Sequence, residues 1–221
     1  RDRTQGPLVA KLEKKLKKYL GSKYALVCSS GTAALHLSLL SIGLKKDDII
    51  IMPSINFIAV YNLSITLGAK VILVDVDPLT GQMIPEKVLS LINSKNRNKV
   101  KAIITMNLGG YPENIKKFFD IKKKFGLYLI EDACHALGSS FLYNNKLKKI
   151  GSCKYADIST FSLHPLKVIT SGEGGVISTN SHSLAKKIEA LRSHGLKKNK
   201  EHYWKYTHED FGYNYRLSEI N

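Results

Sequence analysis

Cysteine, tryptophan and arginine are all scarce in this chain of 221 residues. The three cysteines, Cys28, Cys134 and Cys153, are far apart and form no C-x-x-C pair, so the sequence indicates neither a disulfide scaffold nor a zinc site or other metal site. That usage fits a reducing compartment, and we expect a cytoplasmic protein. No apolar run approaches the ~18 residues of a membrane span, and the first residues lack the apolar core of a signal peptide. We therefore expect no membrane association.

Positive charge is abundant, but it is almost all lysine. The chain has 34 basic and 18 acidic residues, a net charge of +16, and only five of the basic residues are arginine. Nucleic-acid contacts usually draw on arginine together with aromatic residues or a recognised motif. The pattern therefore favours a solvated, lysine-rich surface over a nucleic-acid partner, although a non-catalytic basic binding module stays an alternative. The 43% hydrophobic content is typical of a globular domain with a substantial core.

Helical and strand-like patterns alternate along the whole chain. Several of the strand-like runs are apolar on both faces, which is typical of strands covered by helices on both sides. This βαβ alternation predicts a single α/β domain over residues 1–221, built on an open, mostly parallel sheet with helices on both faces. The predicted strands are 24–28, 48–52, 70–76, 100–106, 127–132, 157–162 and 175–180, and the predicted helices are 8–20, 29–43, 57–67, 85–93, 113–126 and 183–194.

Ligands of open parallel sheets gather beyond the carboxyl ends of the strands. The segment Ser29-Ser30-Gly31-Thr32 follows the first predicted strand and opens a helix. Free backbone N–H groups and hydroxyls at a helix N-terminus can hold an anion, although the same residues also form an ordinary helix cap. Neither G-x-G-x-x-G after this strand nor a P-loop is present, which excludes the usual dinucleotide and P-loop nucleotide sites.

Two carboxylates end the strand at 127–132. Because adjacent strand residues point to opposite faces, at most one of Glu131 and Asp132 can face a given site. Asp132 could serve chemistry there or only cap a loop. His135 follows three residues later.

The richest segment runs from Phe161 to Gly175. It holds Ser162, His164 and Lys167 before a glycine-rich turn. Unlike the other lysines, Lys167 is flanked by apolar and turn-forming residues. A lysine held there loses solvation of its ammonium, which favours the neutral, nucleophilic amine that Schiff-base chemistry requires. An anion cradle, a strand-end carboxylate and such a lysine together fit pyridoxal phosphate.

These residues carry a family resemblance. The chain resembles the DegT/StrS family of pyridoxal-phosphate sugar aminotransferases, within the aspartate-aminotransferase fold type (fold type I). The resemblance covers almost the whole chain, and its most specific strings are EDACHALGS and FSLHPLKVITSGEGG, with TQGPLVAKLEKKLKKYLGSKYALVCSSGTAALHLSLLSIGL, MPSINFIA, LRSHG and GYNYRLSEIN in addition. It implies that residues 1–221 are the cofactor-binding large domain, and that the smaller C-terminal domain of family members is absent from this chain.

The resemblance also implies roles for individual residues. Lys167 is expected to link covalently to the cofactor and to move a proton, and Asp132 to keep the ring nitrogen protonated. The remaining cofactor contacts that it implies are Gly31, Thr32, Ala33 and Ser162 at the phosphate, Phe57 stacked on the ring, His135 beside the ring, and Asn214 at the phosphate of the partner subunit of a homodimer. One departure is that Asn107 and its neighbours read MNLGG where many members have a V-H pair.

The activity implied is transfer of an amino group, from glutamate by analogy, to a keto group of a nucleotide-diphosphate sugar. The motifs look most like members that act on 4-keto-6-deoxy hexoses for surface polysaccharides. A different pyridoxal-phosphate reaction on the same scaffold, such as synthesis of cyclitol or aromatic amines, stays an alternative. Relatives that dehydrate deoxysugars replace the lysine by histidine, whereas Lys167 is present here.

Overall fold

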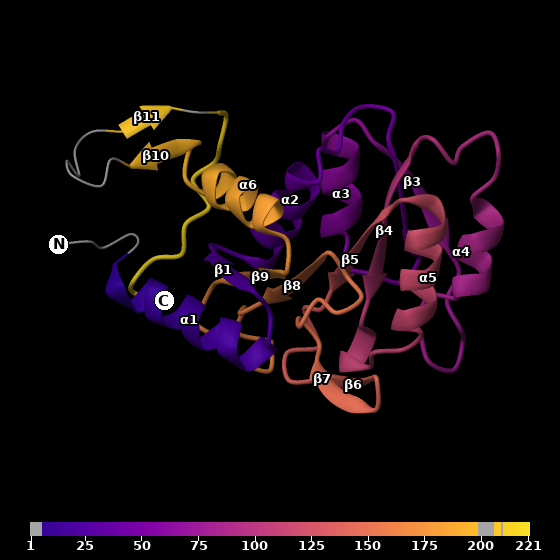
Figure 1. Ribbon diagram of the computed structural model, residues 1–221, viewed down its shortest axis with the longest axis horizontal. Helices are drawn as coiled ribbons and strands as arrows, with labels where there is room; N and C mark the ends of the chain where they lie inside the picture. The colour runs from indigo at the N-terminus through magenta and orange to yellow at the C-terminus, as the bar shows by residue number, and fades with distance from the viewer. Residues whose placement is uncertain (1–5, 199–205, 209) are drawn as a thin grey trace.

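A seven-stranded sheet forms the centre of the protein (Figure 1). The computed structural model describes residues 6–198, 206–208 and 210–221. Residues 1–5, which include Thr4 and Gln5 of the TQGP string, and residues 199–205 and 209 of the predicted domain 1–221 lie outside these ranges. In spatial order the strands are β1 (Tyr24–Cys28), β9 (Gly175–Thr179), β8 (Ile158–Ser162), β5 (Tyr128–Asp132), β4 (Val100–Met106), β2 (Ile49–Pro53) and β3 (Lys70–Val74).

The sheet is mostly parallel, as predicted. Strands β3, β2, β4, β5 and β8 pair in parallel, and β9 is antiparallel to both of its neighbours, β8 and β1. The carboxyl ends of β4, β5 and β8 therefore meet at one edge. All seven strands had been predicted within one or two residues of their bounds, whereas the reversed direction of β9 had not.

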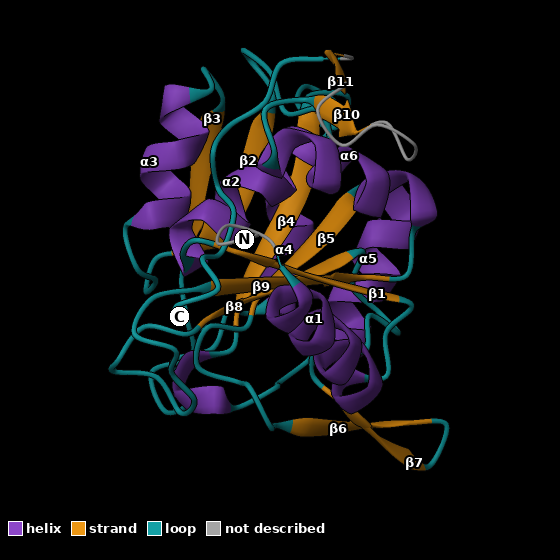
Figure 2. Cartoon of the chain, turned by 90° about the vertical axis from the view of Figure 1, so that its left-hand side faces the viewer, coloured by secondary structure: helices purple, strands orange, loops and turns teal. Residues whose placement is uncertain are grey.

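Helices cover both faces of the sheet (Figure 2). One face packs against α2 (Gly31–Ser41), α3 (Ala59–Thr66) and α6 (His182–Arg192). The other face packs against α4 (Pro85–Leu91) and α5 (Ile115–Phe125), with α1 (Pro7–Leu20) at the β1 end. The remaining short elements are η1 (Leu108–Gly110), the hairpin strands β6 (Ser140–Tyr143) and β7 (Lys146–Lys149), and the pair β10 (Leu196–Lys198) and β11 (Tyr206–His208).

Helix α1 ends where the sequence predicts and is tied to the sheet by a buried ion pair. Gly21 adopts φ 72° and its N–H donates to the carbonyl of Lys17, a left-handed helix ending that glycine favours. On the inner face, Glu13 accepts hydrogen bonds from Arg192 Nη1 at 2.6 Å and from the N–H of Val27 at 3.0 Å. The ion pair thus joins α1, β1 and α6.

Two features differ from the sequence prediction. Strand β3 lies at the sheet edge, so Leu73 is exposed although its run looked buried on both faces. The hairpin β6–β7, which projects at the bottom of Figure 2, was not predicted; its turn is Asn144-Asn145, both with positive φ, as a tight hairpin turn requires.

The last described segment returns to the start of the sheet. Tyr215 accepts a backbone hydrogen bond from Ser29 at 2.9 Å and donates one to Arg192 at 3.0 Å. Its hydroxyl lies 3.0 Å from Nδ1 of the buried His36, and its ring stacks on Tyr213 with centroids 5.0 Å apart. Residues 213–215, which we call the C-terminal strap, are therefore fixed to the loop that enters α2.

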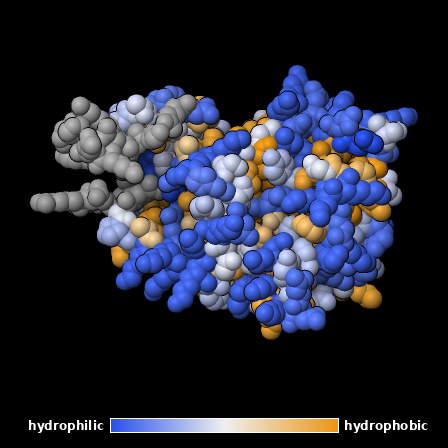
Figure 3. All heavy atoms as spheres, viewed as in Figure 1, coloured by the Kyte–Doolittle hydropathy of each residue, from blue (hydrophilic) through white to orange (hydrophobic). Residues whose placement is uncertain are grey.

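Within the residues that the structure describes, none of the helices combines the length and apolarity needed to cross a bilayer. Hydrophilic side chains cover most of the face seen in Figure 3.

Candidate functional site

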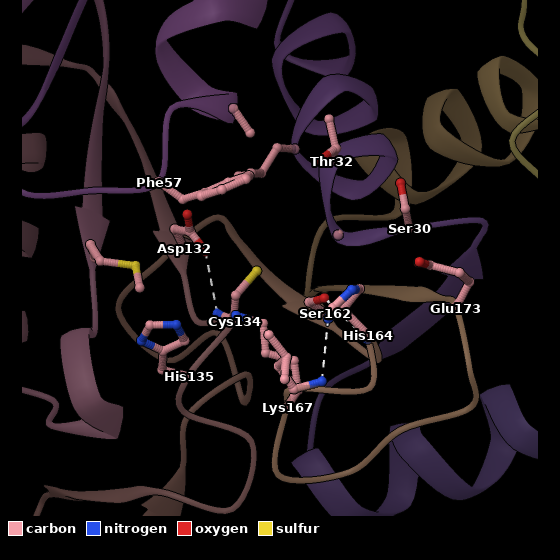
Figure 4. Close-up of a pocket in the computed structure, with 15 residues that line it drawn as sticks. Ser30, Thr32, Phe57, Asp132, Cys134, His135, Ser162, His164, Lys167 and Glu173 are labelled. Atoms are coloured by element: carbon pink, nitrogen blue, oxygen red, sulfur yellow. Dashed lines mark hydrogen bonds between the residues drawn. The ribbon is translucent and has the colours of Figure 1, made fainter.

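A cavity of about 530 Å³ opens at the edge of the sheet where β4, β5 and β8 end, beside the N-terminus of α2 (Figure 4). Its lining combines polar groups with apolar side chains. The lining residues are Ser30, Gly31, Thr32, Leu35, Phe57, Ala59, Met106, Asp132, Cys134, His135, Ser162, His164, Leu166, Lys167 and Glu173. Seven of the predicted site residues are therefore brought together, from positions 31 to 167 of the sequence.

The first turn of α2 forms one wall of the cavity. The Ser30 side chain caps the helix by accepting from the N–H of Ala33 at 3.0 Å. The first backbone helical bond is made by Ala34, so the N–H groups of Gly31 and Thr32 precede the helical ladder. Gly31 packs against Ser162, because a Cβ at position 31 would lie 2.8 Å from the Ser162 Cβ. The segment can therefore serve both as a helix cap, through the Ser30 side chain, and as an anion cradle, through the N–H groups of Gly31 and Thr32.

Asp132 presents a buried carboxyl group at the end of β5. It is 2% exposed, its Oδ1 accepts from the N–H of Cys134 at 3.3 Å, and it has no ion-pair partner within the described part of the chain. Burial raises the pKa of Asp132, opposed by the hydrogen bonds from Cys134 and by the charges of His135 and Lys167. Glu131 points to the opposite face of the sheet, where Ser159 binds it, so one carboxylate of the pair faces the cavity, as predicted.

His135 and Cys134 lie beside this carboxyl group. Burial lowers the pKa of His135, the positive charge of Lys167 lowers it further, and Asp132 opposes both. The neutral imidazole is therefore favoured and can either accept or donate a hydrogen bond. Burial, followed by the charge of Asp132, raises the pKa of the Cys134 thiol. This thiol is consequently not activated as a nucleophile.

Lys167 lies in a turn that His164 organises. The backbone N–H of Lys167 donates to the carbonyl of His164 at 2.9 Å, and the N–H of Leu166 donates to His164 Nδ1 at 3.2 Å. The surroundings of Lys167 differ from the expectation. The apolar neighbours that were expected to desolvate it, Leu166 and Val168, are 88% and 74% exposed, so within this chain they do not enclose the amine.

The other predicted residues fall into two groups. Phe57 lines the cavity from the loop before α3, with much of its ring exposed. Ala33 is buried behind the cavity and its N–H is taken by Ser30, and Asn214 is exposed on the C-terminal strap, so neither residue lines the cavity. Sequence reasoning did not single out Met106 as a lining residue, although its place as the last residue of a parallel strand could have revealed it.

The cavity fits the group that the sequence predicts. A buried carboxyl group without a counter-ion suits a cationic heterocyclic N–H, and two N–H groups at a helix N-terminus with the Ser162 hydroxyl suit a phosphate. The amine of Lys167 borders the same cavity as Asp132, which is what a small heterocycle held by both residues requires.

Comparison with known proteins gives consistent matches over the whole chain. The family model described as the DegT/DnrJ/EryC1/StrS aminotransferase family matches residues 2–221. A curated relative, the UDP-4-amino-4,6-dideoxy-N-acetyl-beta-L-altrosamine transaminase of Campylobacter jejuni, is 39% identical over 217 residues, which are 98% of this chain and 55% of that protein. The chain spans about half the length of the curated relatives it matches.

Solved structures share the fold. Helicobacter pylori PseC, an aminotransferase involved in the biosynthesis of pseudoaminic acid, superposes with a TM-score of 0.87 at 32% identity, covering 99% of this chain and 56% of PseC. NtdA of Bacillus subtilis, solved with bound cofactor PMP, gives a TM-score of 0.84 at 31% identity, covering 99% of this chain and 46% of NtdA.

Proposed function

Because the chain belongs to the DegT/DnrJ/EryC1/StrS aminotransferase family, we propose that it is the cofactor-binding part of a pyridoxal-phosphate-dependent sugar aminotransferase. The acceptor is a keto group of a nucleotide-diphosphate sugar, most closely a 4-keto-6-deoxy hexose used in surface polysaccharides, and the donor is glutamate. The names of the matched relatives support this substrate class. The observation that carries the proposal is that Asp132, Lys167 and the N-terminus of α2 face one cavity.

Several residues of the cavity have a task in this proposal. Pyridoxal phosphate, when bound, supplies an aldehyde that condenses with amines and a ring that takes up electron density. Asp132 accepts the N–H of the ring and keeps it protonated. The N–H groups of Gly31 and Thr32 bind the phosphate. Lys167 would hold the cofactor covalently and, once its amine is released, would carry the proton that the amino transfer requires.

His135 and Phe57 orient the ring. The neutral imidazole of His135 would donate or accept a hydrogen bond beside the ring, and Phe57 would pack against it. The high positive charge of the chain supports an anionic diphosphate substrate, since a net charge of +16 attracts anions.

We assign the active form to a homodimer in the cytoplasm, with residues 1–221 as the large domain. Three apolar residues of the Lys167 turn, Leu166, Val168 and Ile169, are exposed beside the cavity, and a second copy would cover them. Asn214 is exposed on the C-terminal strap, which supports a contact with the partner's phosphate rather than with its own site.

Borohydride trapping tests the covalent step. We expect reduction of the pyridoxal-phosphate-loaded chain to leave the cofactor on Lys167 in peptide mass mapping, and the Lys167→Ala variant to lose both the adduct and the visible absorption band. The matched control, Lys11→Ala on the exposed side of α1, should keep both. A trapped adduct spread over surface lysines, with Lys167 unmodified, would refute the proposal.

Glutamate then tests transamination. Added to the cofactor-loaded homodimer, glutamate should bleach the visible band and release 2-oxoglutarate. A keto-sugar nucleotide should then restore the band. Restoration by a keto-cyclitol but not by a keto-sugar would instead support the alternative substrate class. Salt-sensitive DNA binding without any cofactor adduct would support a basic binding module.

A further inference from the structure

A row of buried polar side chains crosses the sheet on the face opposite the cavity. Thr105 of β4, Glu131 of β5, Ser159 of β8 and Ser178 of β9 are successive cross-strand partners. None of the four is more than 4% exposed. The next row along the strands contains Met106, Asp132 and Thr160, whose first two members line the cavity. The two rows are thus separated by one residue step and by the thickness of the sheet.

Glu131 is the acidic centre of this row. Its Oε2 accepts from the Ser159 hydroxyl at 2.5 Å, and Ser159 Oγ lies 3.5 Å from Cys153 Sγ. Ser178 continues the chain of contacts by donating to the carbonyl of Gly151 at 2.8 Å. Among the described residues no lysine or arginine pairs with Glu131. A buried carboxyl group without a counter-ion is held more easily in its neutral form, as a hydrogen-bonding group.

The backbone around Glu131 fixes the end of β5 on both sides. The Thr160 hydroxyl donates to the Glu131 carbonyl at 3.3 Å, and the Ala133 N–H donates to the Thr160 carbonyl at 2.9 Å. On the other side, Asn107 N–H donates to the Asp132 carbonyl at 3.1 Å. Asp132 therefore sits on a peptide unit that the two neighbouring strands hold, and the Glu131–Ser159 contact is a hydrogen bond between side chains of β5 and β8 one residue away from it.

We propose that Glu131 is a positioning residue for Asp132: its hydrogen bond to Ser159 locks β5 against β8 and fixes where the Asp132 carboxyl enters the cavity, and its charge state sets how strongly Asp132 holds a proton or an N–H donor. This proposal rests on the proposed function of Asp132. Glu131 itself touches neither the cavity nor its contents, so it acts only through β5 and through its charge.

The charge effect has a defined direction. Burial raises the pKa of Glu131 to about 7, opposed by the hydrogen bond from Ser159. In this proposal, an ionised Glu131 would place a second negative charge one residue from Asp132, across the sheet, and so would make Asp132 hold a proton more tightly. The groups that face Glu131 are Thr105, Ser159 and Cys153, and α5, which covers this face, contributes apolar residues such as Phe118 and Ile121. On the cavity side, His135 and Lys167 also act on Asp132.

Folding stability provides a readout that needs no cofactor. Because the native chain keeps the Glu131 proton at pH values where the unfolded chain has lost it, this residue stabilises the fold most at low pH. That contribution falls as the pH rises from about 4.5, the ordinary glutamate value, to about 7. Glu131→Gln keeps a hydrogen-bond acceptor for Ser159 but cannot ionise, so its urea unfolding curve should lack this pH-dependent fall. The control Glu189→Gln, on the exposed side of α6, should keep it.

The positioning role is tested on Asp132. In the cofactor-free chain, carboxyl carbon NMR should show the Asp132 titration displaced in Glu131→Gln and displaced and broadened in Glu131→Leu. In the loaded chain, Glu131→Leu should bind pyridoxal phosphate roughly tenfold more weakly, and Glu131→Gln should lose part of the pH dependence of cofactor affinity while retaining its affinity at low pH. An unchanged Asp132 titration and an unchanged pH profile of affinity in both variants would overturn the proposal.

The two proposals fail in different ways. If the wild-type chain forms no adduct at Lys167, the proposed function fails, whereas the Asp132 titration of the cofactor-free variants still decides the role of Glu131. If the wild-type adduct forms normally but neither Glu131 variant changes the Asp132 titration, only the positioning role fails. Glu131→Leu tests loss of the contact, and Glu131→Gln, which preserves it, keeps the test valid should the leucine variant fail to fold.

Discussion

The close packing of Gly31 against Ser162 gives a prediction that a double-mutant cycle can test. In Gly31→Ala, the new methyl carbon would lie 2.8 Å from the Ser162 Cβ, 3.2 Å from its Oγ and 3.3 Å from its Cα. Ordinary contacts of this kind begin near 3.4 Å, so α2 and β8 must separate by several tenths of an ångström. These two elements form the wall of the cavity that we propose as the phosphate site, so the separation should weaken binding of pyridoxal phosphate as well as the fold.

The magnitude follows from two opposing effects. Overpacking of this kind costs about 1–3 kcal/mol, while alanine in a helix favours folding over glycine by at most about 1 kcal/mol. Because the helical gain is present in every background, the coupling between the two positions isolates the clash. Ser162→Gly removes the Cβ that is struck, and we expect a coupling of about 1–3 kcal/mol with Gly31→Ala. Ser162→Ala keeps that Cβ, and we expect a coupling below about 0.5 kcal/mol.

Urea unfolding of the cofactor-free chain measures both couplings. Thermal midpoints provide a second estimate, at about 2–4 °C for each kcal/mol in a chain of this size. The double variant Gly31→Ala with Ser162→Gly should recover the stability lost in the first variant, and the double variant with Ser162→Ala should not. Equal recovery in both double variants would refute the close-packing argument. So would a Gly31→Ala substitution that costs no unfolding free energy in any of the three backgrounds.

Two further predictions concern side chains that hold the site in place. Ser30→Ala and Ser181→Ala each remove a helix cap and should each cost about 1 kcal/mol of unfolding free energy. Fluorescence titration should find weaker pyridoxal phosphate binding for Ser30→Ala alone, and an equal loss of affinity in both variants would contradict the proposed anion cradle. Glu13→Gln leaves the buried Arg192 guanidinium without its counter-charge, which should cost about 3–5 kcal/mol in urea unfolding. Glu189→Gln breaks an exposed pair and should cost less than about 1 kcal/mol, so similar losses in the two variants would speak against a buried pair.

Local signals predicted most of the fold. The leucine spacing and Gly21 set the end of α1, and the apolar runs set the seven strands, because these features depend on neighbours within one or two turns of chain. The hairpin β6–β7 was missed because its strands are short and lysine-rich, and only Asn144-Asn145 marks the turn. The exposure of Leu73 follows from the edge position of β3, which is decided by strand order and not by the run itself.

The site was predicted only in part, because some of its features follow from local sequence and others from how the strands pair. Asp132 ends β5 and Lys167 lies in the turn that follows β8, and the carboxyl ends of parallel strands lie at one edge of a sheet, so their meeting could be anticipated. The polar row through Glu131 could not, because its members come from four strands whose pairing is not written in any one segment. The exposure of Leu166 was likewise not predictable, since whether an apolar residue is covered depends on everything that packs around it.

The C-terminal strap has a consequence for the order in which this protein can be made. Strand β1 is synthesised long before its only partner in the described sheet, β9, and longer still before Tyr215, the residue that bonds Ser29. Local helices can form during translation, whereas the wall of the cavity next to Ser29 closes only after Tyr215 has left the exit tunnel. Nascent chains that stop short of residue 213 should therefore carry every predicted cofactor contact from Gly31 to Lys167 and still capture the cofactor poorly.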